Sequence, residues 1–206
     1  MLPQFPRARP WAPLSLGGLL LCALPGLAAA ASWQFQVRSP EGQPLADAVV
    51  AVEIKGPTRT TSARAEIAQR DRRFIPNVLV VQTGTAVSFP NQDSVRHHVY
   101  SFSPAKRFDI KLYAGTPAEP IVFDKPGVAP LGCNIHDRMS AFVVVVDTPV
   151  FGKTDEQGLL TLDLPPGEHL LRLWHPSRLQ PQLVEQRLSV AAGQAAGQSS
   201  LVLAPQ

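Results

Sequence analysis

A cysteine, a histidine and a methionine stand three residues apart at Cys133, His136 and Met139. A thiolate, an imidazole and a thioether are soft or borderline ligands, and together they favour copper over a hard cation. One more imidazole would complete two histidines, one cysteine and a weak axial methionine, the ligand set typical of blue-copper sites. The spacing therefore predicts a single type 1 copper site, with its fourth ligand supplied from elsewhere in the chain.

Two adjacent histidines earlier in the chain, His97 and His98, can supply the missing imidazole. They precede a segment, 99–102, that is expected to be a β-strand. Successive side chains of a strand point to opposite faces, so only one of the two histidines should point inward. On the residues alone, either histidine is a candidate.

Each of these residues also has an ordinary structural alternative. Cys133 could be a buried thiol or pair between molecules, and Met139 by itself would be core filling. Zinc is the main rival metal, because it also binds cysteine and histidine. A structural zinc site needs four nitrogen or sulfur ligands, however, and methionine is a poor fourth. Ligand softness therefore favours copper.

The segment 1–31 has the composition of a signal peptide. Arg7 and Arg9 precede an apolar stretch that ends in small residues from Ala28 to Ala31. The stretch is shorter than the ~20 residues needed to cross a bilayer, so we expect export to the periplasm and no membrane span after cleavage. Cys133 would then be a lone cysteine where thiols usually form disulfides, and metal ligation would account for it.

Composition bounds the fold class and the partners. Hydrophobic residues make up 45% of the 206 residues, enough for one or two cores. The 21 prolines and 14 glycines divide the chain into short segments rich in Val, Leu and Phe, which predicts an all-β protein. The net charge of +3 falls closer to zero when Arg7 and Arg9 are removed, and it gives no reason to expect a nucleic-acid partner.

Alternating apolar and polar residues predict strands in an outer and a middle part of the chain. In the outer part, half-buried antiparallel strands are expected over residues 33–37, 48–54, 160–164, 169–174, 183–190 and 200–203. In the middle part, strands are expected over residues 78–81, 86–89, 99–102, 107–113, 119–123 and 141–146.

The middle part resembles the cupredoxin family, and its short ligand loop resembles that of amicyanin. The resemblance is carried by "FIPNVLVVQTGTAVSFPNQDSVRHHVYSF" and "FDKPGVAPLGCNIHDRMSAFVVVVD", with Asn91-x-Asp93 and Gly132-Cys133 among the matching features. It implies a Greek-key β-sandwich with His97, Cys133, His136 and Met139 as copper ligands. His98 then stands where the family usually has asparagine, and Arg96 where proline is common. The whole chain is similar to periplasmic cupredoxins labelled methylamine utilisation proteins.

The outer part resembles the transthyretin-like, carboxypeptidase-regulatory β-sandwich family. The match lies in the turn motifs Gly42-Gln43-Pro44-Leu45, Thr154-Asp155-Glu156-Gln157-Gly158 and Pro165-Pro166-Gly167. We therefore expect a cupredoxin domain over 57–148, inserted into a discontinuous sandwich formed by 32–56 plus 149–206.

These features predict a periplasmic electron carrier and not an enzyme, because the sequence shows no nucleophile–base pair, acid pair or open metal position. A redox protein is the expected partner, docked by the copper domain or by the outer sandwich. A basic surface formed by Arg96, Lys106, Arg107 and Arg138 would favour an acidic one. The oligomeric state is left open. Copper delivery or buffering is the first alternative, and a non-redox cell-envelope binding module is the second.

Overall fold

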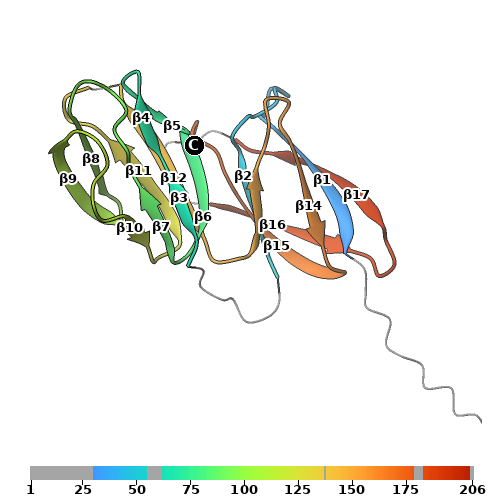
Figure 1. Ribbon diagram of the computed structural model, residues 1–206. Coiled ribbons are helices and arrows are strands. Elements are labelled where there is room, and N and C mark those ends of the chain that lie inside the picture. Colours follow the sequence, from blue (N-terminus) through green and yellow to red (C-terminus); the bar gives the residue numbers. More distant parts are fainter. Residues whose placement is uncertain (1–29, 55–61, 137, 179–182, 205–206) are drawn as a thin grey trace, which may run out of the picture.

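The computed structural model describes residues 30–54, 62–136, 138–178 and 183–204. The expected signal peptide, apart from Ala30 and Ala31, lies outside these residues. Within them the secondary structure consists of strands with no helix, which confirms the predicted all-β class (Figure 1). No helix long and apolar enough to cross a membrane occurs in this part of the chain.

The outer parts of the chain form two sheets that enclose one apolar core. The first sheet has the order β14 (Leu159–Leu164), β1 (Ala31–Arg38), β17 (Ala196–Val202). The second has the order β13 (Val150–Lys153), β2 (Val49–Glu53), β15 (Gly167–Trp174), β16 (Val184–Val190). The expected antiparallel pairing is wrong for β1 and β17, which run parallel from Ser32↔Ala196 to Arg38↔Val202.

The middle part forms a second group of sheets. A five-stranded sheet has the order β6 (Val78–Gln82), β12 (Ser140–Val146), β11 (Gly127–Gly132), β8 (His97–Phe102), β9 (Arg107–Tyr113). A three-stranded sheet has the order β10 (Ile121–Phe123), β7 (Thr85–Ser88), β3 (Arg64–Glu66). A hairpin adds β4 (Ala68–Arg70) and β5 (Arg73–Ile75).

Several strands bury both faces, because the two groups of sheets also pack on each other. On β2, Val50 and Val52 belong to the core of the outer sandwich, whereas Val49 and Ala51 belong to a third cluster between the groups. On β12, Val143 and Val145 face the core of the middle sandwich, and Val144 and Val146 face that same third cluster. Side chains alternate along a strand, so an uninterrupted apolar run supplies two cores at once. The expectation that the outer strands are half-buried is therefore wrong for β2.

An aromatic contact marks the packing between the two groups. The rings of Phe142 on β12 and Trp174 on β15 have centroids 4.9 Å apart, and Trp174 is buried. The chain enters the middle group between Glu53 and Arg64 and leaves it between Val146 and Val150. The division into domains 57–148 and 32–56 plus 149–206 stays a prediction.

Candidate metal centre

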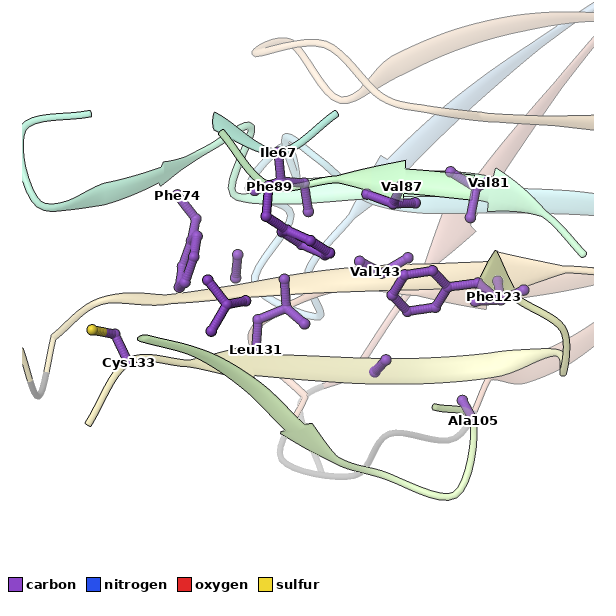
Figure 2. Packing of buried hydrophobic residues seen from close by; sticks show 14 of the residues in the cluster. Ile67, Phe74, Val81, Val87, Phe89, Ala105, Phe123, Leu131, Cys133 and Val143 are labelled. Carbon is purple, nitrogen blue, oxygen red and sulfur yellow. The ribbon is translucent and has the colours of Figure 1, made fainter. Parts of the chain in front are cut away.

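Three of the four expected ligands meet at one end of the middle sandwich. Ligand atoms of His97, Cys133 and His136 all lie within 4.8 Å of one another. His97 begins β8 and Cys133 directly follows β11, and these strands are neighbours in one sheet. Figure 2 shows Cys133 at one end of the buried apolar cluster, with Phe123 and Ala105 at the other. Residues 36 positions apart are thus joined by strand pairing.

The loop between β11 and β12 carries Cys133, His136 and the fourth candidate, Met139. Its ends are held together because Gly132 pairs with Ser140. Within it, the main-chain nitrogen of Met139 donates a 2.8 Å hydrogen bond to the oxygen of His136. Met139 is buried in the same cluster as Cys133. The role of Met139 as the fourth ligand stays a prediction.

Three histidines have a buried ring nitrogen without a partner among the described residues, and two of them, His97 and His136, belong to this site. His97 and His136 each have a buried Nδ1 with no hydrogen-bond partner among the described residues. Their ring centroids lie 5.1 Å apart. An unsatisfied buried polar atom costs roughly 1–3 kcal/mol, and a cation bound by both nitrogens would remove that cost. With the Cys133 sulfur beside them, these donors fit copper.

His98 is buried as well, but it serves a different contact. Its Nε2 hydrogen-bonds Asp109 Oδ1 on β9, and its ring lies 5.2 Å from that of Tyr100. The β8–β9 pairing shifts register between His97 and Val99. Burial therefore does not separate the two histidines, whereas His97 alone belongs to the group with Cys133 and His136.

Asp93 belongs to the Asn91-x-Asp93 motif, which does not by itself predict the contact of Asp93 with His97. Asp93 Oδ2 lies 2.7 Å from His97 Nε2. The carboxylate also accepts hydrogen bonds from the main-chain nitrogens of Asp71 at 2.7 Å and Arg72 at 3.0 Å. Burial by itself would raise the pKa of Asp93, but these hydrogen bonds together lower it below its ordinary value. The four-residue spacing between Asp93 and His97 was the available signal.

A second polar group includes the half-buried Tyr113, which pairs with His97 across β8 and β9. The hydroxyl of Tyr113 donates a 2.6 Å hydrogen bond to the Phe89 oxygen and contacts the buried Gln69 amide. Burial raises the pKa of Tyr113 to about 12, and a negative charge on Cys133 adds to the shift, against the lowering effect of Gln69. Tyr113 therefore stays protonated at neutral pH.

Gly132 leaves no room for a side chain beside the cysteine. A Cβ atom at this position would lie 2.7 Å from the ring of Tyr100. The contact fixes the main chain immediately before Cys133 against β8. Packing against Tyr100 therefore explains why glycine precedes Cys133.

The four cations expected to form one basic surface are divided. Arg96 and Arg138 are exposed next to the site. Lys106 and Arg107 lie at the opposite end of the β8–β9 hairpin, beside Ala105, which Figure 2 places at the far end of the core from Cys133. Lys106 is also paired with Asp124 at 2.8 Å. The prediction that all four form a single basic patch is therefore wrong.

Solved structures similar to part of this chain include a cupredoxin, a pseudoazurin and an amicyanin. They include a purple cupredoxin from Nitrosopumilus maritimus, with 24% identity over 40% of this chain and 99% of that one, at a TM-score of 0.36. A pseudoazurin from Sinorhizobium meliltoi has 20% identity over 42% of this chain and 76% of its own, at a TM-score of 0.33. A reduced amicyanin variant has 16% identity over 47% of this chain and 98% of its own, at a TM-score of 0.38. No protein-family model and no curated protein matches the chain.

Proposed function

We propose that this chain is a periplasmic copper protein that carries single electrons, with His97, Cys133, His136 and Met139 as the ligands of one type 1 site. The observation that carries the proposal is the pair of unpartnered Nδ1 atoms on His97 and His136, which lie with the Cys133 sulfur in one group. This donor set suits copper better than zinc or a hard cation.

Bound copper would supply a one-electron couple, and the chain's own residues would hold the site in one shape. His97, Cys133 and Met139 are buried, so water has little access to the sulfur ligands. Neighbouring strands carry His97 and Cys133, and the short β11–β12 loop carries His136. A site fixed in this way rearranges little when its charge changes. We propose no bond-making step on a substrate and therefore no enzymatic activity.

His136 is the candidate ligand through which we expect electrons to enter and leave. It is partly exposed, whereas the other three candidates are buried. Its surroundings include the exposed apolar side chain of Ile135 and the exposed cation Arg138, with Val95 and Arg96 before His97. An apolar centre flanked by positive charge favours an acidic redox protein as the partner.

The test compares the chain lacking residues 1–31 with its Cys133→Ser variant, each loaded with Cu(II). We expect an intense thiolate-to-copper absorption band and a narrow copper hyperfine splitting, both absent from the variant. We also expect a mild reductant and oxidant to bleach and restore the band repeatedly. A weak cupric spectrum that is the same in both proteins would contradict the proposal.

The same samples separate electron transfer from copper delivery. A carrier should retain its copper through redox cycles and in the presence of a metal-free acceptor protein. Rapid loss of copper to the acceptor, without reversible cycling, would favour delivery instead. Absence of any copper binding would leave a β-sandwich interaction module.

A further inference from the structure

The Asp93 carboxylate lies between a candidate ligand and a tight turn. Its Oδ1 accepts from the Asp71 nitrogen, and its Oδ2 accepts from both the Arg72 nitrogen and His97 Nε2. An ionised carboxylate only accepts hydrogen bonds, so the proton of the 2.7 Å contact belongs to His97 Nε2. The contact therefore selects one form of the imidazole.

That form leaves the other ring nitrogen free to bind a cation. A neutral imidazole carries one proton, and a proton held on Nε2 leaves Nδ1 with its lone pair available. Nδ1 of His97 is the buried atom that has no partner among the described residues. The carboxylate thus keeps the imidazole in the form that can bind a cation, even in the metal-free protein.

The turn that holds Asp93 has left-handed backbone at both of its central residues, as a two-residue hairpin favours. Asp71 and Arg72 join β4 to β5 as a two-residue turn, with φ values of 54° and 58°. Left-handed backbone at two residues other than glycine costs of order 1 kcal/mol each. It lets two consecutive main-chain N–H groups converge on one carboxylate.

Asp93 is also fixed from its own side of the chain. Its nitrogen donates a 3.0 Å hydrogen bond to Asn91 Oδ1, and Asn91 Nδ2 donates to the oxygens of Val95 at 2.8 Å and Tyr113 at 2.9 Å. The loop leading to His97 is therefore held by the buried Asn91 while the β4–β5 turn holds the carboxylate. Little freedom remains for the His97 ring.

We propose that Asp93, held by the β4–β5 turn, is a positioning residue that orients His97 and keeps its Nδ1 free for the metal. The proposal rests on the proposed function for the identity of the metal, but the contact with His97 exists in the metal-free chain. A carboxylate on the far nitrogen also makes the imidazole a stronger ligand, and losing such a partner typically weakens metal binding about 10- to 100-fold.

Two substitutions separate orientation from charge. Asp93→Ala removes every acceptor. Asp93→Asn can place its carbonyl oxygen where Oδ2 accepts from Arg72 and His97, at the expense of an amide N–H set against the Asp71 nitrogen. Both variants weaken the turn, but only the alanine variant deprives His97 of its acceptor.

The first readout needs no metal. In proton and nitrogen magnetic resonance of the metal-free protein, the His97 Nε2 proton should be protected from solvent exchange in the wild type and in Asp93→Asn. It should be lost in Asp93→Ala. A His97 proton equally protected in all three proteins would overturn the proposal, whether or not copper binds.

The second readout uses Cu(II) and the thiolate-to-copper band. We expect affinity to fall about 10- to 100-fold in Asp93→Ala and less in Asp93→Asn. The reduction potential should rise in both variants, because a negative charge beside the site favours Cu(II) over Cu(I). Asp124→Asn, which removes an exposed carboxylate paired with Lys106, is the charge control and should change neither quantity.

The failures of the two proposals are distinguishable. If the wild type forms no Cys133-dependent copper band but Asp93→Ala loses the protected proton, the proposed function fails and the positioning of His97 stands. If copper binds to Asp93→Ala with wild-type affinity and potential, Asp93 is only a turn-stabilising residue.

Discussion

Two consecutive histidines, His97 and His98, have different partners, and this difference distinguishes a candidate ligand from its neighbour. His97 hydrogen-bonds Asp93 and lies with Cys133, whereas His98 hydrogen-bonds Asp109 and lies against Tyr100. Each has one buried nitrogen without a partner among the described residues. Burial and residue type are therefore the same, and only the neighbours distinguish a candidate ligand from a structural histidine.

Substitution of each histidine by glutamine tests this distinction. We expect His97→Gln to abolish the thiolate-to-copper band, because it removes an imidazole ligand. His98→Gln should keep the band and lower the free energy of unfolding by about 1–3 kcal/mol, since the hydrogen bond with Asp109 is weakened. Absorption of the Cu(II)-loaded proteins and denaturant titration measure the two effects. The reverse pattern would move the ligand assignment to His98.

Much of the candidate site was predictable from single residues. Cys133, His136 and Met139 share one short loop, so their spacing alone brought them together. His97 required strand pairing across the sheet, which spacing does not give, and a family resemblance chose it. The carboxylate of Asp93 escaped prediction because its role depends on the direction of two main-chain N–H groups in a turn 21 residues away.

At the level of elements, the turn that precedes β14 helps to hold the outer sandwich together. Gly158 has φ +73° and donates a 2.9 Å hydrogen bond to the Asp155 oxygen. The side chain of Asp155 accepts from the nitrogens of Gln157 and Leu159, so one aspartate closes the turn before β14. A Cβ atom on Gly158 would lie 2.6 Å from the Val37 oxygen of β1. The predicted Thr-Asp-x-x-Gly motif thus joins a turn to a neighbouring strand.

Gly158→Ala should lower the free energy of unfolding by about 2–3 kcal/mol, because unfavourable φ adds to a main-chain collision. Gly193→Ala is the matched control. Gly193 has φ +79° with nothing within 4 Å of its Cβ position, so a loss of about 1 kcal/mol is expected. Urea titration of both variants gives the difference. Equal losses would mean that the Val37 contact relaxes without cost.

The strand predictions succeeded and failed for identifiable reasons. Alternation located β1, whose residues Trp33, Phe35 and Val37 all point into one core. The continuous apolar runs of β2 and β12 are typical of strands buried on both faces, whereas residues 48–54 were predicted to be half-buried. What covers the second face is another sheet, and its identity follows from tertiary packing alone.

At the scale of the molecule, the apolar cluster between the two groups of sheets should make them unfold together. Its buried members include Val49, Val144 and Trp174, all close to fully excluded from solvent. An Arg172 side chain from β15 adds ion pairs to Glu53 at 2.6 Å and to Asp147 at 3.3 Å, next to the point where the chain leaves β12. The cluster and the Arg172–Asp147 pair link elements that belong to different predicted domains, whereas the Arg172–Glu53 pair lies within the outer one.

We expect tryptophan fluorescence, from Trp33 and Trp174, and the thiolate-to-copper band to be lost at the same denaturant concentration. Phe142→Ala removes the ring that contacts Trp174. It should separate the two transitions and lower the free energy of unfolding by about 2–4 kcal/mol. Phe108→Ala, which weakens the middle core without touching that cluster, should shift both transitions together. Coincident transitions in Phe142→Ala would show that the cluster does not couple the two parts.

The parallel pairing of β1 with β17 has a mechanical consequence. Tension applied at Ala31 and Val202 would pull the two strands past each other in opposite directions and load all their rungs simultaneously, in shear. Hydrogen bonds loaded in this way must break together, unlike those of a hairpin that opens one rung at a time. The strands between them in sequence, including those that carry His97 and Cys133, would bear no tension until that ladder failed. The pairing of the first and last strands of the described chain would therefore bear the applied force. The candidate metal centre would stay unloaded until the force ruptured that strand pair.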